Sequence, residues 1–403
     1  MAAIRRRAFL ATSVGVLAAP AVRAQEAPLR IAVLNDQSGV YADVAGPGSV
    51  VAARLAVEDF GGRVGSTPVE VLFADHQNRP DTGLSITRQW FDRDGVSMVI
   101  DIPTSSVALA VAEVTREKNR VFIASGAASA DLTGRACSPN TVHWTMDNVA
   151  IANSVGKAIV AAGGRSWFFI TADYAFGQDL EAQVSQVVRA AGGELLGAVR
   201  HPLGGADFSS FLLQAQRSRA QIIGLANGGG DTINCIRQAA EFGIVQRGQK
   251  LASLLVAITD IHALGLNVAQ GLQFTEAFYW DLNEGTRTWS RRFAPRHGGR
   301  MPGQVHAGVY AGITHYLKAV RQVGSARDGA AVVRAMKAMG TDDPLFGRGT
   351  IRADGRKLHD MFLFEAKAPS ESSGPWDYYK LVRTVPPDEA FRPIDAARCN
   401  FAT

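Results

Sequence analysis

Residues 96–124 read VSMVIDIPTSSVALAVAEVTREKNRVFIA. The apolar run at 96–100 is typical of a buried parallel strand, and a second such run follows at 121–124. Between the two runs, apolar residues at helical spacing predict a helix that ends near Lys118. A strand, a helix and another strand in this order form the repeating unit of parallel α/β sheets.

The same alternation extends in both directions along the chain. Toward the N-terminus, two strands and two helices are expected, at 29–34, 69–74, 50–60 and 81–91. Toward the C-terminus, a second series of strands and helices is expected, with strands at 166–170, 194–199, 221–226 and 251–256 and helices at 151–162, 179–191, 208–218 and 232–242. Two series of similar length and order predict an α/β fold of two similar, doubly wound parallel-sheet lobes that short crossings join.

The last third of the chain departs from this rhythm. Strand-like runs occur at 271–275 and 277–280. Helical spacing follows at 286–293, 305–323 and 330–339. Three further runs predict antiparallel strands, at 346–350, 360–365 and 378–382.

The first 24 residues have the features of an export signal. Three arginines, at 5–7, precede an apolar stretch at 9–21 that is too short to span a bilayer, and the small residues at 22 and 24 predict cleavage near Ala24. The run RRAFL at 6–10 resembles the twin-arginine export signal, and an arginine-rich general secretory signal is the alternative. We therefore expect an exported, periplasmic protein.

The charge content argues against one class of function, and the cysteine content predicts one disulfide. Residues 1–24 contain four arginines and no acid, so of 42 basic and 37 acidic residues, 38 and 37 remain in the rest of the chain. Such a balance gives no support to nucleic-acid binding. Of the three cysteines, Cys235 lies in an apolar helical pattern, whereas Cys137 and Cys399 lie among loop-forming residues, so we expect a disulfide between the latter two.

Three hydroxyl side chains, Thr104, Ser105 and Ser106, occupy the turn between the strand at 96–100 and the following helix. One reading is a helix cap, which would use one hydroxyl. A second reading is an anion site, because the free N–H groups and the dipole of a helix N-terminus bind a carboxylate without Lys or Arg. A nucleophilic serine would need a base and usually a G-x-S-x-G elbow, and neither is visible here.

Further segments follow in an order and spacing typical of one family, at 38–43 (SGVYAD), 52–59 (AARLAVED), 104–106, 123–133 (IASGAASADLT), 173–177 (DYAFG), 208–211 (FSSF) and 238–243 (QAAEFG). With the export signal, they make the chain resemble the periplasmic solute-binding proteins of ABC importers, of the leucine/isoleucine/valine-binding type. The resemblance covers nearly the whole chain after residue 24. No single one of these motifs is diagnostic.

The resemblance implies a type I periplasmic binding fold with three hinge crossings, near 145–148, 275–279 and 357–361. The first lobe would comprise 25–146 and 279–357, and the second lobe 147–278 and 358–403. A small ligand would bind in the cleft at the carboxyl ends of the parallel strands, and the lobes would close around it by a hinge motion. Such a protein is a monomer that needs no cofactor, catalyses no reaction and presents its ligand to a membrane permease.

The ligand site that the resemblance implies draws on both lobes. The expected contacts are Tyr41, Thr104, Ser105, Ser106, Gly126, Ala127, Ala128, Tyr174, Phe176, Asn227, Gly228 and Asp260. Amino-acid-binding relatives have a threonine at the position of Ala128 and an aromatic residue where this chain has glycines at 228–230. These departures favour a bulkier aromatic or other hydrophobic carboxylate.

The alternative ligand is a branched-chain or other amino acid, whose ammonium group Asp260 or Glu276 would bind. Asp231, by contrast, is expected to cap the helix that follows it. A sensory ligand-binding subunit is a second alternative. A secreted Rossmann-type enzyme is disfavoured because its cofactor fingerprint is missing. No pair of histidines, together with a carboxylate, has the spacing typical of a metal site.

Overall fold

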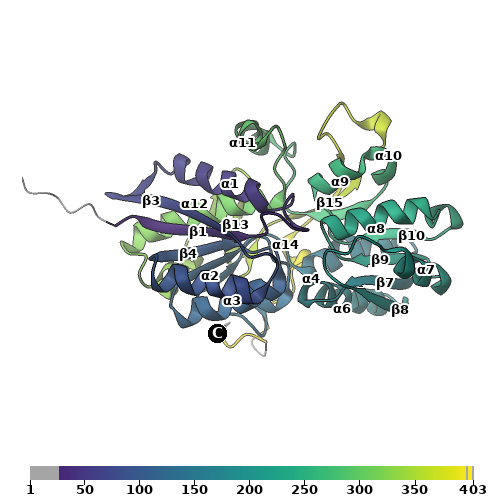
Figure 1. Ribbon diagram of the computed structural model, residues 1–403, viewed down its shortest axis with the longest axis horizontal. Coiled ribbons are helices and arrows are strands. Elements are labelled where there is room, and N and C mark those ends of the chain that lie inside the picture. Colours follow the sequence, from purple (N-terminus) through teal and green to yellow (C-terminus); the bar gives the residue numbers. More distant parts are fainter. Residues whose placement is uncertain (1–26, 396–397, 402–403) are drawn as a thin grey trace, which may run out of the picture.

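The computed structural model describes residues 27–395 and 398–401. The expected export signal, including the cleavage site near Ala24, lies outside these residues. Two lobes of α/β structure lie side by side, and extended segments connect them (Figure 1). None of the helices that the structure describes is both long and apolar enough to cross a membrane.

The first lobe contains a six-stranded sheet in the order β2-β3-β1-β4-β5-β6. Its strands are β1 (Leu29–Asn35), β2 (Arg63–Val64), β3 (Thr67–Asp75), β4 (Val96–Asp101), β5 (Val121–Ala124) and β6 (Thr141–His143). All of their pairings are parallel except that of the short edge strand β2.

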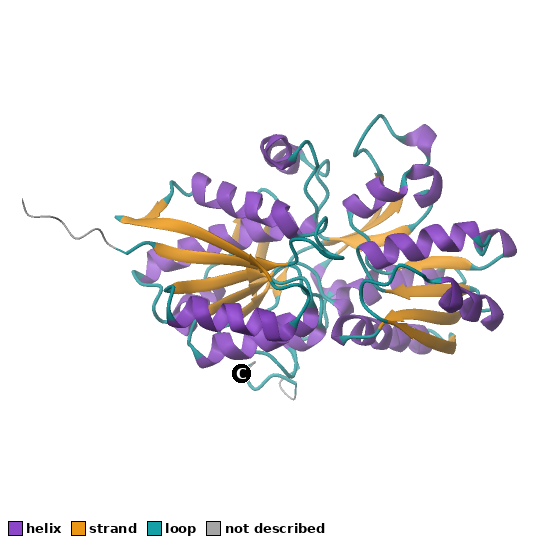
Figure 2. Ribbon diagram, in the orientation of Figure 1, coloured by secondary structure: helices purple, strands orange, loops and turns teal. Residues whose placement is uncertain are grey.

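Helices cover both faces of this sheet (Figure 2). One face packs against α1 (Gly46–Asp59) and α12 (Gln304–Val323), and the other against α2 (Pro80–Asp92) and α3 (Ser105–Glu117). Alternate residues of β1 enter the two cores, because successive strand side chains point to opposite faces.

The second lobe repeats this arrangement with a parallel sheet in the order β8-β7-β9-β10. Its strands are β7 (Ser166–Ala172), β8 (Glu194–His201), β9 (Ile222–Ala226) and β10 (Lys250–Ser253), and its main helices are α6 (Ala175–Ala190), α7 (Ser209–Ser218) and α8 (Gly230–Glu241). The order matches β3-β1-β4-β5 of the first lobe. The expectation of two similar doubly wound lobes is therefore confirmed.

The remaining strands form two small antiparallel sheets. One joins β11 (Gln273–Glu276), β15 (Met361–Ala366) and β16 (Tyr379–Val385), and the other joins β12 (Thr341–Asp343), β13 (Gly347–Ile351) and β14 (Lys357–Leu358). The helices among them are α11 (Glu284–Phe293), α13 (Gly329–Ala338) and α14 (Pro387–Ala390). The predicted antiparallel strands of the tail are thus present.

Some elements differ from the sequence prediction. The helix expected at 151–162 consists of α4 (Asn148–Ile151), a π-helical turn at 152–156 and α5 (Lys157–Ala161). The strand expected at 277–280 is a loop, because this aromatic segment leaves the sheet to cross between the lobes. Short elements such as β6 and α9 (Ile258–Leu264) were not predicted.

The chain passes between the lobes after β6, after β11 and between β14 and β15. A fully buried arginine, Arg356, holds the first and third crossings together. Its Nη2 and Nη1 donate to the carbonyl oxygens of Thr145 and Met146 at 2.8 and 3.3 Å, and its guanidinium lies 4.6 Å from the ring centre of Phe391. The exact lobe boundaries stay a prediction.

The C-terminal tail makes a further link between the lobes. Ala390 of α14 accepts a hydrogen bond from Asn153 of the second lobe at 3.0 Å. A disulfide then joins Cys399 to Cys137, which lies between β5 and β6 of the first lobe, with a Cα–Cα distance of 5.7 Å. The bond pairs the two cysteines expected from the sequence, and Cys235 is free and buried. The expected assignment of 358–403 placed the whole tail on the second lobe. The disulfide shows that the end of the tail lies on the first lobe.

Candidate functional site

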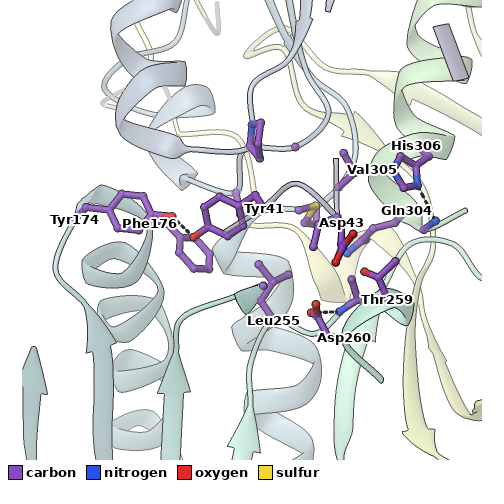
Figure 3. A pocket seen from close by; sticks show the side chains of 18 residues that line it. Tyr41, Asp43, Tyr174, Phe176, Leu255, Thr259, Asp260, Gln304, Val305 and His306 are labelled. Carbon is purple, nitrogen blue, oxygen red and sulfur yellow. Dashed lines mark hydrogen bonds between the residues drawn. The ribbon is translucent and has the colours of Figure 1, made fainter. Parts of the chain in front are cut away.

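A largely apolar pocket lies between the two lobes at the carboxyl ends of their parallel strands. Figure 3 shows aromatic side chains at one end and polar side chains at the other. The space open to the centre of a water molecule is only about 30 Å³, enough for about two waters. The structure is thus a closed form, and a ligand can enter only if the lobes separate.

The aromatic end is built by Tyr41 from the loop after β1 and by Tyr174 and Phe176 at the start of α6. The hydroxyl groups of Tyr41 and Tyr174 hydrogen bond to each other across the cleft. Burial raises the pKa of both tyrosines, so both hydroxyls stay neutral. All three residues were expected at the site.

The opposite end contains a buried carboxylate, Asp260, in the first turn of α9. Its Oδ2 accepts a hydrogen bond from the N–H of Ala257 at 2.9 Å, while Oδ1 has no partner among the described residues. Burial, with a smaller contribution from Asp43, raises the pKa of Asp260 to about 7. The neighbouring Thr259 hydroxyl also has no partner within the described part of the chain.

His306 closes the pocket from the first turn of α12. Its Nδ1 accepts from the N–H of Gly303 at 3.1 Å, which leaves Nε2 to donate to the carbonyl of Ala45 at 3.0 Å. Burial lowers the pKa of His306 to about 3, so the ring is neutral. Asp43, at the pocket's rim, pairs with Arg300 at 2.5 Å. Within the described residues, no Lys or Arg lines the pocket.

The hydroxyl turn adjoins this pocket through Pro103, which is part of the lining, whereas the expected contacts Thr104, Ser105 and Ser106 are not. Thr104 is the N-cap residue of α3, but its hydroxyl donates to the Asn78 side chain and caps nothing. The Ser105 hydroxyl is buried and has no partner among the described residues, and Ser106 is half-buried. The helix-cap reading of these hydroxyls is therefore wrong, and the anion-site reading stays a prediction.

The loop after β5 contributes Gly126 and Ala128 to the lining, whereas Ala127 points inward and its carbonyl accepts from His143 at 2.8 Å. A Cβ at Gly126 would lie 2.6 Å from Oδ1 of Asp101 and 2.9 Å from Cα of Pro103. This glycine is needed for close packing of the two first-lobe turns. Burial raises the pKa of Asp101 to about 7.

The loop after β9 differs from expectation. Asn227 turns away from the pocket and hydrogen bonds to His201 and Thr232, at 3.2 and 2.6 Å. Gly228 is not part of the lining, whereas Gly229 is. Gly229 is also the N-cap residue of α8, so Asp231 does not cap this helix; its Oδ2 accepts from the N–H of Gly204 at 3.1 Å.

Several lining residues were not expected from the sequence. They are Asp43, Val44, Pro103, Met146, Gly229, Leu255, Ala257, Thr259, Gly303, Gln304, Val305 and His306. The four residues at 303–306 follow the second crossing and have no local signal. Glu276, the alternative ammonium partner, lies behind the pocket in β11 and accepts from the Tyr379 hydroxyl at 3.4 Å. Among the described residues, no three His, Cys, Asp or Glu side chains are placed to hold a metal ion.

In this closed form the pocket has room for about two waters, so it could enclose a solute with an apolar body only with the lobes further apart. At one end it offers the Asp260 carboxylate and the Thr259 hydroxyl, and no Lys or Arg is among the described lining residues. The N-terminus of α3 lies next to Pro103, which is also part of the lining. An ammonium group would satisfy Asp260, and a carboxylate would suit the free N–H groups of α3.

Comparisons with known proteins agree with this geometry. A periplasmic binding protein from Burkholderia mallei shares 48% identity, with a TM-score of 0.88 over 91% of this chain and 96% of that chain. A branched-chain amino acid ABC transporter periplasmic ligand-binding protein from Burkholderia xenovorans shares 39% identity, with a TM-score of 0.81 over 93% of this chain and 100% of that chain. The Leu/Ile/Val-binding protein homolog 6 of Brucella melitensis is 24% identical over 88% of this chain and 90% of its own length.

The family model described as "Periplasmic binding protein" matches residues 28–374. Members of this family bind solutes in the periplasm and are not enzymes. The chain therefore belongs to the periplasmic binding protein family and is a solute-binding protein of an ABC transporter.

Proposed function

We propose that this protein binds a hydrophobic α-amino acid of the branched-chain class and delivers it to the permease of its transporter. The observation that carries the proposal is the unpartnered Oδ1 of Asp260. A buried carboxylate is costly unless a cation pairs with it, and the described residues that line the pocket supply none. The ammonium group of an amino acid would fill this place.

The rest of the pocket suits such a ligand. Leu255, Val305 and Met146 supply apolar surface for a branched side chain. Ser105 and the N-terminus of α3 would bind the ligand carboxylate. The name of the 39% identical relative supports the same ligand class. An aromatic carboxylate without an amine would leave Asp260 unpaired, so the amino acid replaces it as our preferred ligand.

Calorimetric titration of L-leucine, L-isoleucine and L-valine would test the proposal. Asp260→Asn removes the charge at nearly constant volume, and we expect an L-leucine affinity at least about 100-fold lower, because breaking a buried ion pair costs about 3–5 kcal/mol.

Asp231→Asn is the matched control, because Asp231 is a buried carboxylate of the same lobe that lies outside the pocket lining. This variant should bind L-leucine like the wild type. If benzoate binds and none of the three amino acids does, the proposed ligand class is wrong.

A further inference from the structure

The loop at residues 36–41, here called the latch loop, is held in one shape by a buried carboxylate. Asp36 is fully buried and accepts hydrogen bonds from the N–H groups of Gly39 and Tyr41, at 2.6 and 2.9 Å. It also accepts from the side-chain amide of Asn78 at 2.6 Å. This network fixes the direction in which Val40 and Tyr41 project from the first lobe.

The latch loop contacts the second lobe directly, through two hydrogen bonds. The N–H of Gly230 donates to the carbonyl of Val40 at 3.1 Å. The hydroxyls of Tyr41 and Tyr174 form the second contact, beside the pocket (Figure 3). Both bonds exist only while the cleft is closed, because each joins one lobe to the other.

The glycine run at 228–230 is the surface that receives the latch loop. A Cβ at Gly229 would overlap the carbonyl oxygen of Val40, and a Cβ at Gly230 would lie 3.3 Å from Cγ2 of Val40. Gly229 also has a φ of +59°, which side chains rarely adopt. The sequence suggested that these glycines make room for a bulkier ligand. The structure shows that they do not enlarge the pocket. The space that they leave is occupied by the latch loop.

We propose that the latch loop and the glycine run form a latch that stabilises the closed form through direct contacts between the lobes, and that Tyr41 limits the size of the ligand. The second part rests on the proposed amino-acid function. Tyr41 is 4% exposed, and its ring ends the pocket on the aromatic side, so a longer ligand side chain would have to displace it.

Breaking the latch should change the association and dissociation rates of the ligand in a way that simple destabilisation of the fold would not. The latch stabilises the closed form with or without ligand, so breaking it should open both states. Association then becomes faster because more of the free protein is open, and dissociation becomes faster because the closed complex is less stable. The dissociation constant changes less than either rate, because the two effects oppose each other.

Gly229→Ala tests the latch. Spin labels at Glu113→Cys and Gln214→Cys, on exposed faces of α3 and α7, would report the distance between lobes in the ligand-free protein. We expect the short distance to be populated more in the wild type than in Gly229→Ala. With L-leucine in stopped flow, both rates should rise at least about tenfold.

Gly243→Ala is the matched control, since its φ of +64° imposes similar backbone strain at the other end of α8, away from the first lobe. It should leave the lobe distance unchanged. The latch is refuted if the wild type is as open as Gly229→Ala. The ligand-free distance does not depend on ligand identity, so a failure of L-leucine to bind would overturn only the proposed function.

Tyr41→Ala and Tyr41→Phe test the size limit. Removal of the ring should improve binding of L-tryptophan relative to L-leucine at least about tenfold, whereas Tyr41→Phe should retain the wild-type preference. Thermal unfolding would show that both variants are folded. An unchanged preference in a folded Tyr41→Ala variant would refute the role of Tyr41.

Discussion

Asp260 combines burial with one satisfied and one unsatisfied oxygen. The N–H of Ala257 fixes Oδ2, so Oδ1 keeps a constant direction, and Thr259 beside it adds a hydroxyl without a partner among the described residues. A side chain held in this way is preorganised, so it loses little conformational entropy when a ligand binds.

The raised pKa of Asp260 makes ligand affinity depend on pH. In the free protein the pKa is about 7, and a bound ammonium group would lower it. Below pH 7 the carboxyl must lose a proton before it can bind the ammonium, so L-leucine affinity should fall as pH falls, roughly tenfold between pH 8 and pH 6. Calorimetry at several pH values measures this dependence.

Asp260→Asn should abolish this pH dependence. A rise in affinity as pH falls would contradict the prediction, and it would point to Asp101 instead, a second buried carboxyl whose pKa is raised to about 7. Protonated Asp101 would cease to repel a ligand carboxylate at the N-terminus of α3.

Among the elements, α3 presents its N-terminus to the pocket edge without a side-chain cap. Its first N–H groups have no partners within the helix, and Ser105 adds a buried hydroxyl without a partner among the described residues. This combination favours an anion at the end of the helix.

The double variant Ser105→Ala/Ser106→Ala should weaken L-leucine binding roughly 10-fold or more, because hydrogen bonds to a charged group contribute about 1.5–3 kcal/mol. Stability should change little, since neither serine caps α3. Ser154→Ala, which removes a buried hydroxyl of the second lobe, is the control. Unchanged affinity of the double variant in calorimetry would exclude this anion site.

At the scale of the whole molecule, the sequence predicts what local patterns determine. The apolar runs of β1, β4 and β7 and the helices after them are readable because burial on both faces leaves a continuous apolar signal. The lobes follow from the repetition of that signal.

Features that depend on the meeting of distant segments could not be read in this way. From the sequence alone Gly229 would leave room in the pocket, but Val40, from the other lobe, occupies that space. His306 and Gln304 enter the site only because α12 returns to the first lobe. Tyr41, Tyr174 and Asp260 could be placed at the site by family resemblance, but not the hydrogen bond that joins the two tyrosines.

The disulfide between Cys137 and Cys399 also determines through which part of the chain a pulling force passes. If residues 27 and 401 are pulled apart, the force passes from Cys137 through the sulfur atoms to Cys399, and the chain between them carries no tension. Optical tweezers should therefore record an extended length of roughly 400 Å for the oxidised protein and roughly 1,300 Å for Cys399→Ser, at about 3.5 Å per residue. The second lobe and the part of the first lobe at 279–357 would carry no tension, while residues 27–137 are drawn out. A long extension under oxidising conditions would contradict this load path.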